Sequence, residues 1–236
     1  MRTVVITGAA SGIGRALAQG FAADGWRVFG ADVDEAGLAA LGDGIDTHRV
    51  DVCEQPEVEA LVEAAVAESG RVDVLFNNAG YGLPHTVEDT PDGAFERLVA
   101  VHLFGALHGT RAAIPHMKRQ GRGHIVNTLS RGGEFHAPGG SAYAAAKAGM
   151  WALTRSTARE LRGTGVLVNG MIPGPTNTSI WGKDRPDLQT PESVYPHARF
   201  LAELEPDGPT GKVFWDSKEY PFGDPANRLV IRPERR

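Results

Sequence analysis

The chain has 236 residues, 42% of them hydrophobic and 22% charged, which suits a globular protein with a sizeable apolar core. Its formal net charge of −5 argues against nucleic acid as a partner, since nucleic-acid-binding domains usually carry a basic surface. The single cysteine, Cys53, excludes an internal disulfide and a CxxC metal site, and no apolar run is long enough to span a membrane. We therefore expect a cytoplasmic protein without a metal centre.

Short runs rich in β-branched residues alternate with longer segments of helical periodicity. The runs predict seven strands, at residues 3–7, 27–31, 46–50, 72–76, 124–128, 165–169 and 212–215. The helical pattern covers residues 12–24, 34–41, 55–69, 91–119, 141–162 and 191–204. Most strand runs are continuously apolar, which is typical of parallel strands buried on both faces. The alternation predicts a single Rossmann-type α/β domain, a doubly wound, mostly parallel seven-stranded sheet with helices on both faces.

The first predicted strand runs into a glycine-rich turn that opens the first helix. Gly8, Gly12 and Gly14 allow a sharp turn, close backbone approach to a pyrophosphate and tight helix packing. Free N–H groups at such a helix start attract a phosphate. The turn, with Ser11 and Ile13 between its glycines, predicts a dinucleotide site. A plain strand-to-helix turn is the alternative.

Asp32 ends the second predicted strand. A carboxylate there accepts both ribose hydroxyls of NAD and repels the extra phosphate of NADP, so NAD(H) is favoured over NADP(H). The alternative is a solvated turn acid beside Asp34 and Glu35. Arg15, in the first helix, favours NADP(H) instead, because a guanidinium near this site could bind the 2′-phosphate.

Three further motifs make the chain resemble the short-chain dehydrogenase/reductase family. Asn77-Asn78-Ala79-Gly80 follows the fourth predicted strand, and Tyr143-x-x-x-Lys147 lies on a helix. Pro173-Gly174 follows the sixth strand, with Thr178 after it. With the glycine turn, these motifs cover roughly residues 3–178 in the order that the family shows. The resemblance implies a nicotinamide-dependent alcohol dehydrogenase or ketoreductase acting on a small-molecule ketone or alcohol.

The resemblance also implies which residues hold the cofactor. Asp51 and Val52 match the pair that contacts adenine, and the segment after Pro173 fixes the nicotinamide. The full set is Gly8, Ser11, Gly12, Ile13, Gly14, Asp32, Asp51, Val52, Asn77, Ala79, Gly80, Tyr143, Lys147, Pro173, Gly174 and Thr178. They place the cofactor part at about residues 1–130 and the catalytic and substrate part at about 130–220, before a tail at 221–236.

Tyr143 and Lys147 are one helical turn apart, so their side chains share a face. An ammonium this close is expected to lower the tyrosine pKa from about 10 toward neutrality, as a general acid/base requires. Ser130 matches the family's catalytic serine, which the resemblance implies orients the substrate oxygen. Thr128 and Ser141 are neighbouring hydroxyls that do not match that position.

His102 occupies the position where the family usually has an asparagine that orders a proton-relay water. Two interpretations stand beside each other. His102 relays protons itself, since histidine titrates near neutrality, or it is a packed helix residue and the relay is weakened or rerouted.

The substrate side is the part where the resemblance is thinnest. The resemblance implies that Pro175 to about Thr190 form a short lid containing Trp181, and that residues 132–135, with Glu134, form the opposite wall. The resemblance suggests a homodimer or homotetramer, and the tail residues 229–231 form an edge strand, dock on a partner or are frayed.

Two other functions remain open at this point. One is an NAD-binding sensor or scaffold without turnover, and the other is a non-redox enzyme on the same fold that catalyses elimination or cyclisation. The complete set of Ser130, Tyr143 and Lys147 favours the redox enzyme.

Overall fold

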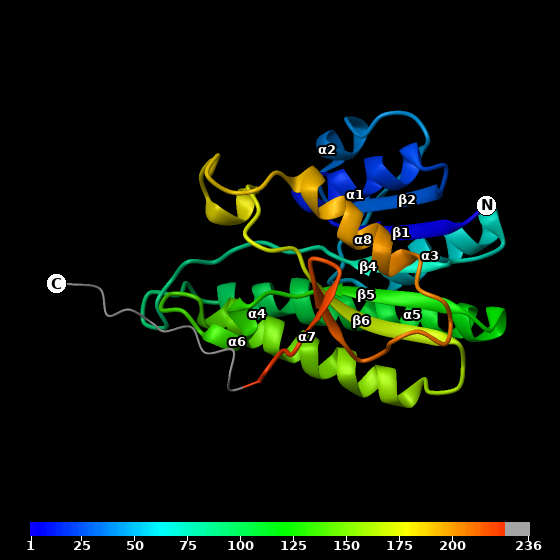
Figure 1. Cartoon of the computed structure of the whole chain (residues 1–236). Coiled ribbons are helices and arrows are strands. Elements are labelled where there is room, and N and C mark those ends of the chain that lie inside the picture. Colours follow the sequence, from blue (N-terminus) through cyan, green and yellow to red (C-terminus); the bar gives the residue numbers. More distant parts are fainter. Residues whose placement is uncertain (225–236) are drawn as a thin grey trace.

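A computed structural model describes residues 1–224, whose strands form one sheet with helices packed on both faces (Figure 1). The strand order is β3-β2-β1-β4-β5-β6-β7-β8, and all neighbours are parallel except β7 and β8. The strands are β1 (Thr3–Thr7), β2 (Arg27–Asp32), β3 (Ile45–Arg49), β4 (Val74–Asn77), β5 (Gly123–Thr128), β6 (Val166–Ile172), β7 (Val213–Trp215) and β8 (Lys218–Tyr220). The predicted doubly wound α/β fold is thus confirmed.

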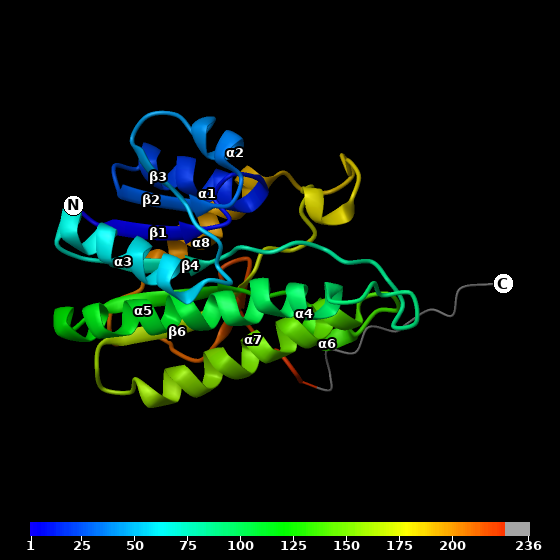
Figure 2. The ribbon, with the colours of Figure 1, turned by 180° about the vertical axis from the view of Figure 1, so that it is seen from behind.

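The helices form two layers, one on each face of the sheet. Apolar side chains of α1 and α8 pack on one face, and those of α3, α5 and α7 pack on the other. Figures 1 and 2 show α8 in front of the sheet in one view and α3 and α5 in front in the opposite view. The helices are α1 (Gly12–Ala23), α2 (Glu35–Ala39), α3 (Gln55–Ser69), α4 (Ala94–Val99), α5 (Gly105–Gln120), α6 (Gly132–Phe135), α7 (Ser141–Glu160) and α8 (Tyr195–Ala202), with short 3₁₀ turns at Ser179–Trp181 and Pro191–Val194.

Burial along the strands follows their place in the sheet. Every residue of β1, β4 and β6 is buried, because helices cover both faces of these central strands. β3, at the edge, has no buried residue and reads Ile-Asp-Thr-His-Arg. Polar side chains on an edge strand limit pairing with other chains.

The structure adds α6 and the 3₁₀ turn Ser179–Trp181, which the sequence did not predict, and it differs from the prediction at the last strand and at the helix predicted at 91–119. The sheet has eight strands rather than seven, because Asp216 and Ser217 both adopt positive φ, 50° and 58°, and turn the chain into an antiparallel hairpin. The helix predicted at 91–119 begins at Ala94 and contains a π-helical segment, Ala100–Phe104, between α4 and α5. Such π segments are frequent at functional sites.

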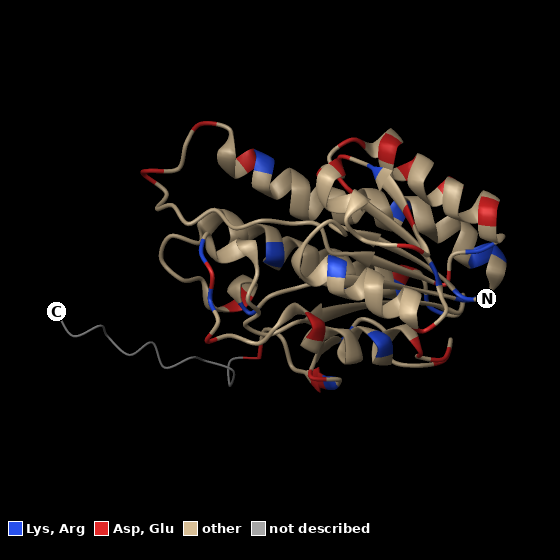
Figure 3. Cartoon of the chain, turned by 90° about the horizontal axis from the view of Figure 1, so that it is seen from above, with Lys and Arg blue, Asp and Glu red and all other residues tan. Residues whose placement is uncertain are grey.

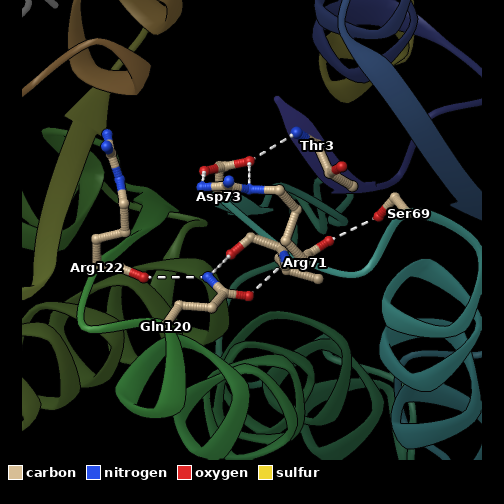
Figure 4. A network of polar contacts seen from close by, with 7 residues as sticks. Thr3, Ser69, Arg71, Asp73, Gln120 and Arg122 are labelled. Atoms are coloured by element: carbon tan, nitrogen blue, oxygen red, sulfur yellow. Dashed lines mark hydrogen bonds and ion pairs between the residues drawn. The ribbon is translucent and has the colours of Figure 1, made fainter. Parts of the chain in front are cut away.

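Polar contacts tie together the start of β4 and its surroundings (Figure 4). The buried Asp73 carboxylate accepts hydrogen bonds from the backbone N–H of Thr3 and from Nε of Arg71, both at 2.8 Å. The Gln120 amide accepts from the N–H of Val72 and donates to its carbonyl, at 2.9 and 2.8 Å. These contacts satisfy buried polar groups and join β1, β4 and α5 at the end of the sheet where β1 and β4 begin.

Within residues 1–224, no helix combines the length and apolar character that a membrane crossing needs. In the view of Figure 3, basic and acidic positions are interspersed over the helices and loops. The tail residues 229–231 and the arginines at the chain end lie outside the described residues.

Candidate active site

A cavity of about 910 Å³ opens where β1, β4, β5 and β6 end. The strand order reverses between β1 and β4, and ligands of open α/β sheets bind at such a switch point. Every predicted site residue except Asn77 lines this cavity. The fold brings residues 8 to 178 together here because the carboxyl ends of parallel strands share one edge of the sheet.

The glycine turn is packed too tightly for side chains. A Cβ on Gly14 would lie 1.9 Å from the Gly8 carbonyl oxygen, and one on Gly8 would lie 2.8 Å from the Cα of Ala79. Gly8 and Gly12 also adopt positive φ, 72° and 50°, which favours glycine. The glycines therefore let the start of α1 pack directly on the turn, and the backbone of the turn lines the cavity.

The start of α1 offers donors to an anion. Ser11 caps the helix without a side-chain hydrogen bond, and the first turn holds no acidic residue. The orphan N–H groups and the helix dipole therefore face the cavity without internal compensation. Arg15, by contrast, donates from Nε and a terminal nitrogen to the Ala10 carbonyl, at 3.0 and 2.5 Å, and does not line the cavity.

Asp32 lies at the carboxyl end of β2 with its side chain fixed. One carboxylate oxygen accepts from the N–H of Ala10 at 3.0 Å, and the other accepts from the N–H of Asp34 at 3.1 Å. Each oxygen keeps lone pairs free for another donor, such as a ribose hydroxyl.

The predicted adenine contact, Asp51, already has a partner that sequence reasoning missed. Arg97 of α4 donates to Asp51 at 2.8 Å and also lines the cavity. Burial by itself would raise the pKa of Asp51, but the hydrogen bonds from Arg97 and the Cys53 backbone outweigh it and hold the pKa below its usual value. The Asp51 carboxylate is therefore charged and oriented, beside the exposed guanidinium of Arg97. No motif pointed to Arg97, since its partner lies in another segment of the chain.

Asn77 corrects one assignment of the sequence analysis. Its side chain is 4% exposed and donates to the Ala106 carbonyl, to Thr110 and to Asn127, so it faces α5 and β5 rather than the cavity. The next residue faces the cavity instead, because successive side chains at a strand end point in opposite directions. Asn78 lines the wall and donates to the Thr7 carbonyl at 3.1 Å.

His102 lies in the π-helical segment, 2% exposed, with its ring at the cavity wall. Its Nε2 lies 3.1 Å from the backbone N of Tyr81 and 2.9 Å from the Tyr81 carbonyl oxygen. Nδ1 is buried and has no hydrogen-bond partner in the described part of the chain. A Cβ on Gly80 would lie 2.1 Å from the ring, so glycine is required there for His102 to fit.

Burial lowers the pKa of His102 to about 3, with a further contribution from the charge of Lys147. The ring is therefore neutral near pH 7. The expectation that His102 titrates near neutrality is wrong for this structure, because the imidazolium would be desolvated and would lie close to an ammonium.

The predicted catalytic side chains converge at one end of the cavity. Tyr143 and Lys147 stand on α7, and the Lys147 Nζ lies 5.5 Å from the centre of the Tyr143 ring. Lys147 is 3% exposed and donates from Nζ to the Thr128 carbonyl at 2.7 Å. The Ser130 hydroxyl accepts from the N–H of Gly132 at 3.0 Å and is hydrogen-bonded to Tyr143.

The pKa values of Tyr143 and Lys147 differ from the sequence-based expectation. Burial raises the pKa of Tyr143, and the hydrogen bond with Ser130 opposes it in part. Burial lowers the pKa of Lys147 to about 7. Spacing alone predicted a lowered tyrosine pKa, but it could not show that both groups are withdrawn from water. In the described form Tyr143 is a neutral phenol that can donate a proton.

The segment after β6 closes one side of the cavity. Gly174 has a φ of 81°, and a Cβ there would lie 3.4 Å from Nε1 of Trp215. The Thr178 methyl lies against Gly12, 3.1 Å from the position of a Cβ on that glycine. Trp181, in the lid, donates from Nε1 to the Thr176 carbonyl at 2.8 Å. The lid thus touches the phosphate-binding turn.

The opposite wall differs from the prediction, because none of residues 132–135 lines the cavity, and Glu134 is directed elsewhere. This carboxylate accepts from the Tyr220 hydroxyl at 2.8 Å and from the N–H of Gly223 at 2.7 Å, and it does not line the cavity. The wall is formed instead by Arg131 and by Trp215 of β7. Trp215 ends a parallel strand, a position that points to the site once the strand is known to belong to the sheet.

Comparisons with known proteins agree with this geometry. The family model described as short chain dehydrogenase matches residues 2–189. The chain is 38% identical over 190 residues to 3beta-hydroxysteroid dehydrogenase 2 of Eggerthella lenta, covering 76% of this chain and 72% of the relative. It is 37% identical over 197 residues to D-beta-hydroxybutyrate dehydrogenase of Rhizobium meliloti, covering 79% and 76%. The crystal structure of 3-ketoacyl-(acyl-carrier-protein) reductase from Brucella melitensis complexed with NADH matches with a TM-score of 0.83 and 31% identity, covering 90% of this chain and 95% of that one.

Proposed function

The chain belongs to the short-chain dehydrogenase/reductase family, and from that premise we propose that it interconverts a secondary alcohol and a ketone with NAD(H), using Tyr143 as general acid and base. The observation that carries the proposal is the convergence of Ser130, Tyr143 and Lys147 in the cavity that also holds the glycine turn. The relatives named above for a hydroxysteroid and a hydroxybutyrate are dehydrogenases of hydroxy compounds, which supports the reaction class.

The residues present fit a nicotinamide dinucleotide. Gly8, Gly12 and Gly14 present a backbone without side chains to the cavity, which lets a pyrophosphate approach it, and the uncapped start of α1 supplies the N–H groups. Asp51 and Val52 would hold the adenine, and Asp32 the adjoining ribose. Lys147, Pro173 and Thr178 would hold the nicotinamide end. When bound, the nicotinamide supplies or accepts the hydride at the substrate carbon.

The chain's own groups handle the proton and the oxygen. The Ser130 hydroxyl donates to the substrate oxygen and stabilises the negative charge that develops there. In reduction the Tyr143 hydroxyl gives its proton to that oxygen, and in oxidation it takes the proton back. Burial keeps the phenol protonated, which suits the reductive direction. The Lys147 ammonium lies close enough to stabilise the tyrosinate that forms.

For His102 we propose a fixed, neutral role instead of titration. Its buried Nδ1 lacks a partner and its ring contacts Tyr143 edge-on, at 5.4 Å between centroids. A water bound to Nδ1 would connect His102 by hydrogen bonds to the part of the cavity near Lys147, while the His102 ring stays neutral. His102→Asn should keep activity, since an amide can hold the same water, and His102→Ala should lower turnover and alter its pH profile. Full activity in the alanine variant would refute this role.

NAD(H) rather than NADP(H) is the proposed cofactor. Asp32 presents a carboxylate where the adenosine ribose would lie, and Arg15 is occupied by the Ala10 carbonyl instead of facing the cavity. The structural relative was crystallised with NADH, which supports the same choice.

The cytoplasmic location and a homodimeric or homotetrameric assembly stay predictions. The expected assembly packs through the fourth and fifth predicted helices, and the alanines and glycines at 99–109 and 142–149 are compatible with it.

Tyr143→Phe tests the proposed function. The variant lacks the hydroxyl, so NADH consumption with a panel of ketones should fall at least about 100-fold. NADH binding, measured by fluorescence, should be nearly unchanged because the ring is retained. Retained turnover would refute the mechanism. No NADH consumption by the unchanged protein over a broad panel, with NADH still bound, would favour a sensor or a non-redox enzyme.

A further inference from the structure

Arg131 places a cation in the wall of the active-site cavity directly after Ser130. Its guanidinium carbon lies 4.3 Å from the ring centre of Phe135, 5.0 Å from that of Trp215 and 5.9 Å from that of Tyr220. Three aromatic rings from α6, β7 and β8 thus surround the charged group. Such contacts fix the plane of a guanidinium without neutralising its charge.

No carboxylate within residues 1–224 forms an ion pair with Arg131. Glu134, three residues along the chain, is directed to the Tyr220 hydroxyl and to the N–H of Gly223. Arg131 Nε is buried and makes no hydrogen bond in the same part of the chain. The guanidinium hydrogen-bonds to the Tyr220 hydroxyl, a neutral group that leaves its charge in place. A partly buried cation without a carboxylate partner is unfavourable by itself, and an anion in the cavity would compensate its charge.

The other cations of the cavity are already engaged. Arg97 is paired with Asp51 at 2.8 Å, and the Lys147 Nζ donates to the Thr128 carbonyl. His102 is neutral, as its burial requires. A carbonyl does not neutralise Lys147, but that ammonium lies beside Tyr143, where it serves the reacting oxygen. Arg131 is a cavity cation with no carboxylate partner within residues 1–224, and a guanidinium can bind a carboxylate through two parallel hydrogen bonds.

The position of Arg131 relative to the reacting groups sets what it can bind. Its Cα is about 3.8 Å from that of Ser130, whose hydroxyl orients the substrate oxygen. Trp215, 5.0 Å from the Arg131 guanidinium, also borders Gly174, where the nicotinamide would lie. An anion held by Arg131 would therefore belong to the same small molecule as the carbonyl and lie a few bonds from it.

We propose that Arg131 binds a carboxylate of the substrate, so that the protein acts on oxo acids and hydroxy acids in preference to their neutral analogues. This inference rests on the proposed redox function. The competing role is a purely structural one, in which Arg131 only holds the β7–β8 hairpin against α6 through its aromatic contacts.

The experiment compares oxo acids of different chain length and ketone position with their methyl esters, in Arg131→Gln, Arg131→Lys and the unchanged protein. NADH consumption gives kcat and KM for each acid and ester. Arg155→Gln is the matched control, because Arg155 is an exposed arginine 5.4 Å from the Trp151 ring and does not line the cavity. Melting temperature and NADH binding of each variant report its folding.

The unchanged protein should prefer the acid in at least one pair. Arg131→Gln should lower the ratio of kcat/KM for acid over ester by about 10- to 100-fold, mainly through KM, since a charged hydrogen bond that persists through the reaction is lost. Arg131→Lys should recover part of the ratio, and Arg155→Gln should leave it unchanged.

Three outcomes would overturn the inference. The unchanged protein prefers the ester in every pair, or Arg131→Gln lowers both activities equally, or it melts earlier with the ratio preserved. Reduction of esters and neutral ketones without any preference for acids refutes the role of Arg131 and leaves the proposed function intact. Absence of NADH consumption with acids, esters and neutral ketones alike refutes the proposed function, and this inference falls with it.

Discussion

Replacing His102 by asparagine should make the protein less sensitive to acid. The His102 ring is 2% exposed, and burial together with Lys147 depresses its pKa from 6.5 to about 3. Between these two values the unfolded chain binds a proton that the folded chain does not. The neutral ring therefore makes its full contribution to the free energy of unfolding above pH 6.5, and this contribution is lost as the pH falls toward 3.

The magnitude follows from the shift. A pH of 5 is about 1.5 units below the histidine pKa of the unfolded chain. Protonation of the unfolded chain therefore lowers the free energy of unfolding by about 2 kcal/mol between pH 7 and pH 5. That loss corresponds to a fall in Tm of about 4–8 °C for a chain of this size. It is insensitive to the folded-state value, because any pKa well below 5 gives the same result.

Thermal melts at pH 7 and pH 5, at one ionic strength and one protein concentration, measure the effect. His102→Asn should reduce the drop in Tm between the two pH values by about 4–8 °C. Any loss of hydrogen bonds to Tyr81 affects both pH values and cancels in the difference. A drop remains from His124, another buried histidine, whose pKa burial lowers to about 4.

The control is His136→Asn. His136 is exposed and has a φ of 46°, which asparagine tolerates well, so this variant should keep the full drop. An equal drop in His102→Asn and the unchanged protein would show that His102 is not held neutral by burial, and the reasoning would fail.

Three further variants test the cofactor site and its surroundings. Asp32→Asn keeps an acceptor for the Ala10 N–H but removes the charge, so the ratio of kcat/KM for NADP(H) over NAD(H) should rise about tenfold or more; an unchanged ratio contradicts the proposed preference. Gly14→Ala places a Cβ 1.9 Å from the Gly8 carbonyl and should weaken NADH binding at least about tenfold by fluorescence titration. Asn77→Ala should cost about 2–4 kcal/mol of unfolding free energy in urea melts, because it leaves buried polar partners unpaired, while the Kd for NADH changes little. A large change in the Kd for NADH would show that Asn77 contributes to cofactor binding.

The sequence determined the order of the elements and the chemistry of the motifs. Continuous apolar runs are typical of buried parallel strands, and the glycines at 8, 12 and 14 follow from a turn with no room for side chains. The spacing of Tyr143 and Lys147 fixed their shared helical face, since it depends only on the helical repeat. These features are local, so a short window of sequence suffices to predict them.

Tertiary structure decided everything that depends on segments far apart in the chain. It turned Asn77 away from the cavity, paired Asp51 with Arg97, and brought Trp215 and Arg131 together at the wall. It also set the charge states, because the pKa values of His102, Tyr143 and Lys147 depend on burial, which only the assembled fold creates. Sequence spacing specifies which groups can meet on one element, whereas their solvation and their partners from other strands and helices arise when the sheet is assembled.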